Sequence, residues 1–233
     1  MKWRSLEESA ASPDMRPLRE IFKERKALIA KYVPIEIQNI HAGVVAELKA
    51  RRVAECALGV GGRMPAFTLS DHNGKAFSSA ERVDKGRLVV CFIRGRWDPF
   101  CCGQMEAMNL VAGQIAEAGA ALVAISPQTV GQSYFMADQH KLRFPLLSDA
   151  GNAVARQCGL VYRVPERQEA IYRRAFVNLP LANGDESWEL PVPATYVVER
   201  DGAVRYASVN EDYTERPEPL EVLAAVEGSS SMS

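Results

Sequence analysis

Residues 87–102 read RLVVCFIRGRWDPFCC and join an apolar run to the start of a helical pattern. The run from Arg87 to Arg94 has the continuous apolar character of a strand that is buried on both faces. Apolar residues then recur at helical spacing from Cys101 to Ala118, which predicts a helix directly after the strand. A cysteine at this junction lies near free backbone N–H groups and the positive end of the helix dipole, and both favour the thiolate.

The charges around Cys101 act in opposite directions. Arg94 and Arg96 add positive charge that favours a thiolate, whereas the carboxylate of Asp98 disfavours a second anion. Two interpretations follow from the residues alone. Cys101 is either a reactive thiolate or a small buried apolar side chain, as unpaired cysteines often are.

The rest of the chain alternates short strands with helices. Strands are predicted over 66–69, 120–126 and 144–147, helices over 130–142, 152–158 and 219–226, a hairpin over 194–210, and an irregular loop with some helix over 163–192. This order predicts an α/β fold with a mixed central sheet and helices on both faces.

Two amphipathic helices precede this pattern, over 17–32 and 35–57. Neither can bury its apolar stripe alone, so they must pack on the rest of the chain or on a second copy. We therefore expect a homodimer formed through these helices. The predicted organisation is an N-terminal helical extension over 1–60, a main domain over 61–228, and a disordered tail over 229–233.

Composition restricts the classes of partner. The formal net charge of −1 over 233 residues gives no electrostatic reason to expect nucleic acid or an anionic membrane. No secretory signal is visible, and the apolar stretches are too short to cross a bilayer. The five cysteines are irregularly spaced and do not suggest a secreted disulfide framework, so we expect a cytoplasmic protein.

Several blocks of the chain resemble one known family. They are MPAFTLSDHNGK, VVCFIRGRWDPFCC, LVAISPQTV, FPLLSDAGNAVARQCGLVY, ELPVPATYVVERDGAVRYASVNEDYT and EPLEVLAA, and they span 64–225. In order and spacing they are similar to the alkyl hydroperoxide reductase / thiol-specific antioxidant group, in particular its peroxiredoxin-like proteins. The resemblance implies a thioredoxin-like fold and thiol-based reduction of hydrogen peroxide or organic hydroperoxides.

The resemblance assigns the peroxidatic role to Cys101, with Asp98, Arg94 and Arg96 around it. In the family signature Pro-x-x-x-Thr-x-x-Cys, Arg94 stands at the Pro position and Asp98 at the Thr position, so both depart from the pattern. The Thr hydroxyl would hydrogen-bond the thiolate and the peroxide, whereas a carboxylate donates a hydrogen bond only when it is protonated.

A second departure concerns the branch that contains Trp-Cys-Pro-Tyr-Cys. The matching segment here is Trp97-Asp98-Pro99-Phe100-Cys101, which lacks the first cysteine, so dithiol–disulfide exchange within the motif is not available. Trp97 and Pro99 are then expected to shape the site.

A third departure lies at Pro193. Peroxiredoxins usually place an activating arginine there, and thioredoxins place a cis-proline beside the active-site sulfur. We therefore predict a cis Val192–Pro193 peptide bond.

A peroxidase needs a second thiol to reduce the sulfenic acid that forms on Cys101. Cys102, Cys158 and Cys56 are the candidate resolving residues, and structural roles compete for each of them. The default is a one-cysteine cycle with an external thiol, namely thioredoxin, glutaredoxin or a low-molecular-weight thiol. No cofactor is implied, and no His/Cys spacing suggests a metal site. The alternative function is a thioredoxin-fold binding or redox-sensing module that has lost its chemistry.

Overall fold

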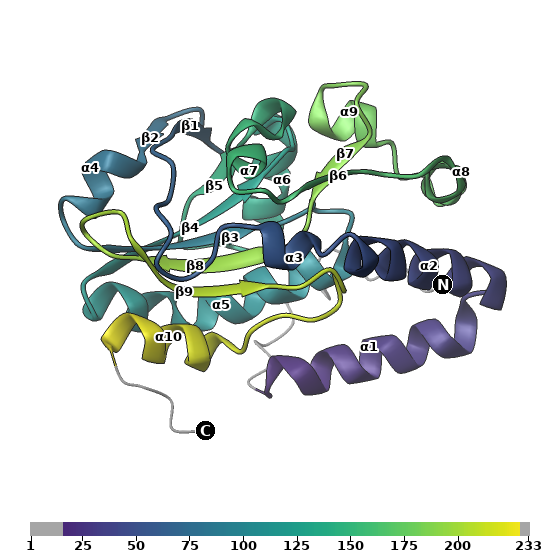
Figure 1. The fold of residues 1–233 in the computed structure, drawn as a ribbon, viewed down its shortest axis with the longest axis horizontal. Coiled ribbons are helices and arrows are strands. Elements are labelled where there is room, and N and C mark those ends of the chain that lie inside the picture. Colours follow the sequence, from purple (N-terminus) through teal and green to yellow (C-terminus); the bar gives the residue numbers. More distant parts are fainter. Residues whose placement is uncertain (1–15, 229–233) are drawn as a thin grey trace.

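The computed structural model describes residues 16–228 and has a seven-stranded mixed sheet at its centre (Figure 1). The strands lie in the order β2-β1-β5-β4-β3-β8-β9; β3, β4 and β5 are parallel, and the other neighbours are antiparallel. Their bounds are β1 Thr68–Asp71, β2 Ala76–Ser78, β3 Arg87–Phe92, β4 Ala120–Ser126, β5 Leu146–Ser148, β8 Ala194–Val198 and β9 Val204–Val209. The predicted mixed sheet is confirmed. The tail predicted over 229–233 lies outside the described residues.

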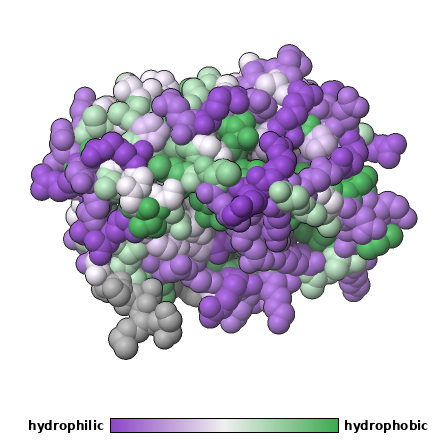
Figure 2. All heavy atoms as spheres, in the orientation of Figure 1, coloured by the Kyte–Doolittle hydropathy of each residue, from purple (hydrophilic) through white to green (hydrophobic). Residues whose placement is uncertain are grey.

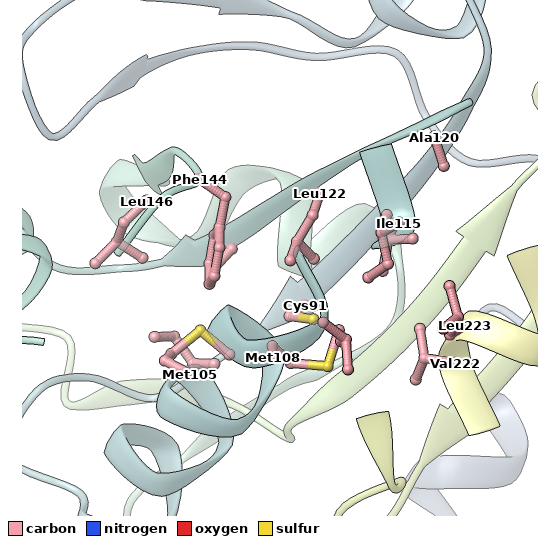
Figure 3. Close-up of a cluster of buried hydrophobic side chains, with 14 of the residues drawn as sticks. Cys91, Met105, Met108, Ile115, Ala120, Leu122, Phe144, Leu146, Val222 and Leu223 are labelled. Carbon is pink, nitrogen blue, oxygen red and sulfur yellow. The ribbon is translucent and has the colours of Figure 1, made fainter. Parts of the chain in front are cut away.

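Helices cover both faces of this sheet, and the alternation of β3 side chains shows how. Val89 and Cys91 point into a cluster built with α5 and α10, whereas Val90 and Phe92 point into a cluster with α7 on the other face. Figure 3 shows Cys91 in the first cluster, beside Met108 of α5. The helices of the main domain are α4 Ser79–Val83, α5 Pro99–Glu117, α6 Val130–Gln139, α7 Ala153–Gln157 and α10 Pro219–Glu227.

The N-terminal extension contains three helices where two were predicted. These are α1 Leu18–Tyr32, α2 Ile35–Ala50 and α3 Val53–Cys56. The predicted helix over 35–57 is interrupted because Arg52 adopts a left-handed backbone with φ 55°, a conformation that cannot continue a helix.

The extension buries part of its apolar stripes on its own chain. Leu18 and Phe22 of α1 pack against Phe100 at the start of α5. Val44 and Leu48 of α2 pack against apolar side chains of residues 162–192. On the face seen in Figure 2, apolar side chains lie in small groups among hydrophilic ones. Leu28 and Tyr32 of α1 and Ile35 of α2 stay exposed, and the homodimer remains a prediction.

The segment expected to be an irregular loop over 163–192 contains more regular structure than predicted. It holds α8 Glu166–Arg174, α9 Leu179–Asn183 and a small antiparallel sheet formed by β6 Val161–Arg163 and β7 Glu189–Pro191. The prediction of a cis Val192–Pro193 bond is wrong, because the described residues contain no cis peptide bond. Pro193 is buried directly before β8 with a trans bond, the form that most X–Pro bonds take.

Candidate active site

Asp98 builds the junction between β3 and α5. As the N-cap residue of α5 it accepts a hydrogen bond from the Phe100 backbone N–H at 2.9 Å through Oδ1. Pro99 follows in the first turn, where a missing N–H costs nothing, and its carbonyl accepts a hydrogen bond from the Arg25 guanidinium of α1. The other carboxylate oxygen of Asp98 faces Cys101, so the residue that starts the helix also sets the environment of the sulfur.

Cys101 lies in the first turn of α5 with no exposed surface. Its thiol donates to Asp98 Oδ2 at 3.0 Å, and its Sγ accepts a hydrogen bond from the Arg94 backbone N–H at 3.4 Å. The Arg216 guanidinium Nη2 lies 3.6 Å from the same sulfur. Burial, and then the Asp98 carboxylate, raise the pKa of Cys101 to about 11, against the lowering effect of Arg216 and Arg94. In this closed arrangement the sulfur is a thiol at neutral pH.

Arg94 and Asp98 form a buried ion pair, with Arg94 Nε 2.8 Å from Asp98 Oδ2. Burial alone would raise the pKa of Asp98, but Arg94 and then Arg216 hold it below its usual value. The Arg94 guanidinium is also enclosed by aromatic rings, lying 3.7 Å from the centroid of Tyr213 and 4.9 Å from that of Trp97. Arg94 thus offers its backbone N–H to the sulfur and its side chain to Asp98.

Arg96 is not brought to the sulfur. Its side chain is exposed, its backbone N–H donates to Gln128 Oε1 at 2.8 Å, and its Nε donates to Gln132 Oε1 at 3.1 Å. Of the two arginines expected beside Cys101, only Arg94 therefore contacts it. Trp97 is half-buried and packs on Tyr172 with 5.0 Å between ring centroids, so it shapes the wall behind Arg94.

The other cysteines are free thiols. Cys102 donates to the Arg96 carbonyl at 3.2 Å. Cys158 is buried beside Met64 in the cluster on the opposite face of the sheet from Cys101. Cys56 is exposed at the end of α3. Within residues 16–228, no disulfide joins any of the three candidate resolving thiols to Cys101.

Arg216, Tyr213 and Tyr172 belong to the site but were not predicted. Arg216 and Tyr213 lie between β9 and α10, more than one hundred residues beyond Cys101, and Tyr172 lies in α8, where its hydroxyl is 3.4 Å from Arg94 Nη1. No local pattern marks these residues, because the fold alone brings them to the start of α5.

The N-terminal extension also contributes a side chain. His41 of α2 lies with its ring centroid 6.0 Å from that of Tyr172 and 6.2 Å from that of Tyr213, and its Nδ1 is 2.9 Å from Gln168 Nε2. Burial, followed by the charge of Arg94, lowers the pKa of His41 to about 4, so the ring is neutral at pH 7.

Within residues 16–228, no group of three or more His, Cys, Asp or Glu could hold a metal ion. In the same range, none of the helices combines the length and the apolar character that spanning a bilayer requires.

Comparisons with known proteins show the family of the chain. The model of the AhpC/TSA family matches residues 60–207. A chloroplastic peroxiredoxin Q of Oryza sativa subsp. japonica is 30% identical over 169 residues, which cover 71% of this chain and 67% of that protein. A chloroplastic peroxiredoxin Q of Arabidopsis thaliana is 31% identical over 152 residues, which cover 65% of this chain and 60% of that protein.

Solved structures share the thioredoxin-like fold of the peroxiredoxins. Peroxidoxin BcpB of Mycobacterium tuberculosis superimposes with a TM-score of 0.58 at 21% identity, over 75% of this chain and 99% of that one. A cysteine-to-serine mutant of peroxiredoxin 6 of Arenicola marina gives a TM-score of 0.59 at 15% identity, over 73% of this chain and 72% of that one. At these identities the likeness establishes the fold, including the predicted thioredoxin-like class.

Proposed function

The chain belongs to the AhpC/TSA family, and from that membership we propose that it is a peroxiredoxin-type thiol peroxidase whose reacting atom is Cys101 Sγ. One observation carries the assignment to this residue. Cys101 lies in the first turn of the helix after strand β3, and both a backbone N–H and a guanidinium face its sulfur. These are the groups that stabilise a thiolate and an oxygen anion leaving from a peroxide.

The proposed reaction is a two-electron oxidation of Cys101. The thiolate attacks the distal oxygen of a hydroperoxide, an S–O bond forms, and the O–O bond breaks. The sulfur becomes a sulfenic acid, and the departing alkoxide or hydroxide takes a proton from water to give an alcohol or water. With a pKa raised to about 11, the sulfur is a thiol at pH 7 in the closed arrangement. Because burial is the main cause of that pKa, the reactive form requires an opening that admits water together with the peroxide.

We further propose that the cycle uses one cysteine of this chain. Cys158 lies across the sheet and Cys56 is exposed on α3, which supports reduction of the sulfenic acid by an external thiol. The candidate donors are thioredoxin, glutaredoxin and a low-molecular-weight thiol. Cys102 stands next to Cys101, but a disulfide between adjacent residues is strained.

Stopped-flow measurement of peroxide consumption tests the proposed function. Wild type is expected to consume hydrogen peroxide or cumene hydroperoxide faster than free cysteine, and Cys101→Ser is expected to lose this activity. Cys102→Ser is the matched control and should retain it. A wild-type rate equal to that of free cysteine refutes the peroxidase.

The sealed, protonated sulfur favours a second candidate, a binding or redox-sensing module without turnover. Such a module would be oxidised at Cys101 once and slowly. Single and repeated additions of peroxide in the presence of excess dithiothreitol separate the two functions, because only an enzyme consumes many equivalents per chain.

A further inference from the structure

Within residues 16–228, Arg216 is the one arginine whose guanidinium contacts Cys101. It lies between β9 and α10 with its side chain 2% exposed, and its Nη2 is 3.6 Å from Cys101 Sγ and 3.9 Å from Asp98 Oδ2. Arg94, by contrast, directs its guanidinium to Asp98 and the aromatic rings and presents only its backbone N–H to the sulfur.

The Arg216 guanidinium is held from several sides. Its Nε donates to Gln104 Oε1 at 2.9 Å, and its Nη1 donates to the Glu215 carbonyl at 2.9 Å and to the Tyr213 carbonyl. The amide of Gln104 is itself oriented by Thr195, because Gln104 Nε2 donates to Thr195 Oγ1 at 3.1 Å. Both polar ends of this fully buried Gln104 side chain are therefore used, one by strand β8 and the other by Arg216.

The charges around the sulfur do not balance while Cys101 is a thiol. Arg94 and Arg216 contribute two positive charges, and Asp98 contributes one negative charge that is bonded to Arg94. Among the described residues, Asp98 is the one carboxylate within ion-pair distance of Arg216, at 3.9 Å. Ionisation of Cys101 would make this buried group neutral, and an unpaired buried charge is costly. The charge of Arg216 is thus arranged for an anion that forms at the sulfur.

We propose that Arg216 is a catalytic residue that pairs with the Cys101 thiolate and with the peroxide oxygen, and that Gln104 is its positioning residue. Pro193 supplies no charge at the position where the family resemblance places an arginine. Residues 193 and 195 lie on the same side of an extended chain, and Thr195 holds the Gln104–Arg216 pair. The positive charge on that side of the site is therefore supplied by Arg216, from the segment between β9 and α10.

This role rests on the proposed peroxidase and adds no chemical step to it. Arg216 stays protonated throughout, because its guanidinium does not lose a proton in proteins. It donates hydrogen bonds to the attacking sulfur and to the oxygen that receives the electron pair of the O–O bond. A guanidinium can contact Gln104 and the sulfur at once through its fork of N–H groups, whereas a lysine ammonium is a single point charge.

The pH profile of Cys101 alkylation tests the proposal without requiring peroxidase activity. The reagent is iodoacetamide, and the modification is quantified on the Cys101 peptide by mass spectrometry. The titratable groups facing the sulfur, apart from Arg216 itself, are Asp98, Arg94, Tyr162 and the adjacent Cys102. None of them is substituted in the variants.

Arg216→Met is expected to move the alkylation profile upward by at least one pH unit, which is a tenfold or greater loss of rate at fixed pH. Arg216→Lys should restore part of the shift, and Gln104→Leu should move the profile in the same direction as Arg216→Met. The matched control is Arg205→Met, which removes an arginine that pairs with Glu199 away from the site and should leave the profile unchanged.

Unchanged profiles in Arg216→Met and Gln104→Leu overturn the proposal, and Gln104→Leu keeps the test decisive if Arg216→Met fails to fold. Peroxide consumption is measured in parallel. A wild type that consumes no peroxide refutes the proposed function, whereas a shifted alkylation profile in the same samples still supports Arg216 as the partner of the thiolate.

Discussion

Helix α1 covers the first turn of α5, and Phe22→Ala should release it and expose Cys101. The Phe22 ring is 3% exposed and meets Phe100 edge-on, with 5.0 Å between centroids. It also contacts the place where a side chain at Gly103 would stand, which shows how closely α1 approaches α5. The remaining attachments of α1 include Leu18, whose backbone N–H donates to Glu218.

The expected effect follows from the size of the buried ring. Replacing a buried Phe by Ala costs about 3–5 kcal/mol, because apolar contacts are lost and a cavity remains. If about 3 kcal/mol of this cost falls on the docking of α1, the fraction of molecules with α1 released rises about 100-fold. Alkylation of Cys101 under native conditions should rise by the same factor, since its rate then follows the open fraction.

The assay measures Cys101 alkylation by iodoacetamide at one pH together with amide hydrogen exchange across α1. Phe77→Ala is the matched control, because it removes a ring of similar burial, 6% exposed, that packs on Phe67 in the β1–β2 region. The control should change the alkylation rate by less than about threefold, as a site distant from α1 adds nothing to its release. Faster exchange in α1 of Phe22→Ala without faster alkylation would show that α1 does not control access to the sulfur.

Three further predictions concern single side chains. Asp98→Asn should lower the pKa of Cys101 from about 11, which the alkylation profile measures. It should also lower the free energy of unfolding, measured by urea denaturation, by about 3–5 kcal/mol, because Arg94 is left buried without its carboxylate. His41 has a pKa of about 4 in the folded protein and 6.5 as a free side chain, so the unfolded chain binds a proton that the folded chain does not. The free energy of unfolding should therefore fall by about 1–3 kcal/mol as the pH falls from about 6.5 to about 4. In urea denaturation at pH 7 and pH 5, His41→Gln should lose less stability between the two pH values than wild type. Cys158→Ala should leave peroxide turnover with dithiothreitol unchanged, because this thiol lies across the sheet from Cys101; a clear loss of turnover would contradict the one-cysteine cycle.

Local patterns were sufficient for the centre of the fold. Strand β4 begins and ends at the predicted residues, Ala120–Ser126, because its apolar run is bounded by Gly119 and by Pro127. By contrast, β6 and β7 pair across more than twenty residues, and neither three-residue strand has a period long enough to be recognised. The break of the second predicted helix at Arg52 was missed for a similar reason, since no Gly or Pro marks it.

The candidate site was predictable only where it is local. Asp98, Arg94 and Cys101 lie within one short segment, and the structure brings all three together. The direction of each arginine side chain was not predictable, because it depends on partners from other elements. Arg96 turns to α6, and Arg216 arrives from the segment before α10.

Access to Cys101 and its activation are coupled by the same physical cause. Burial is the largest contribution to the raised pKa of the thiol, and Phe100, the residue before Cys101, is covered by α1. Release of α1 would admit water and remove part of that contribution. The Arg94 backbone N–H and the hydrogen bond from Arg216 to Gln104 do not involve α1, although α1 also binds Glu215 and Glu218 on either side of Arg216. An opening that only exposed the thiol would raise the rate of alkylation by the same factor at every pH. An opening that also hydrated the thiol would in addition shift the midpoint of the pH profile to lower pH. The Phe22→Ala profile should therefore be both faster and displaced downward, and a faster profile with an unchanged midpoint would show that hydration does not activate Cys101.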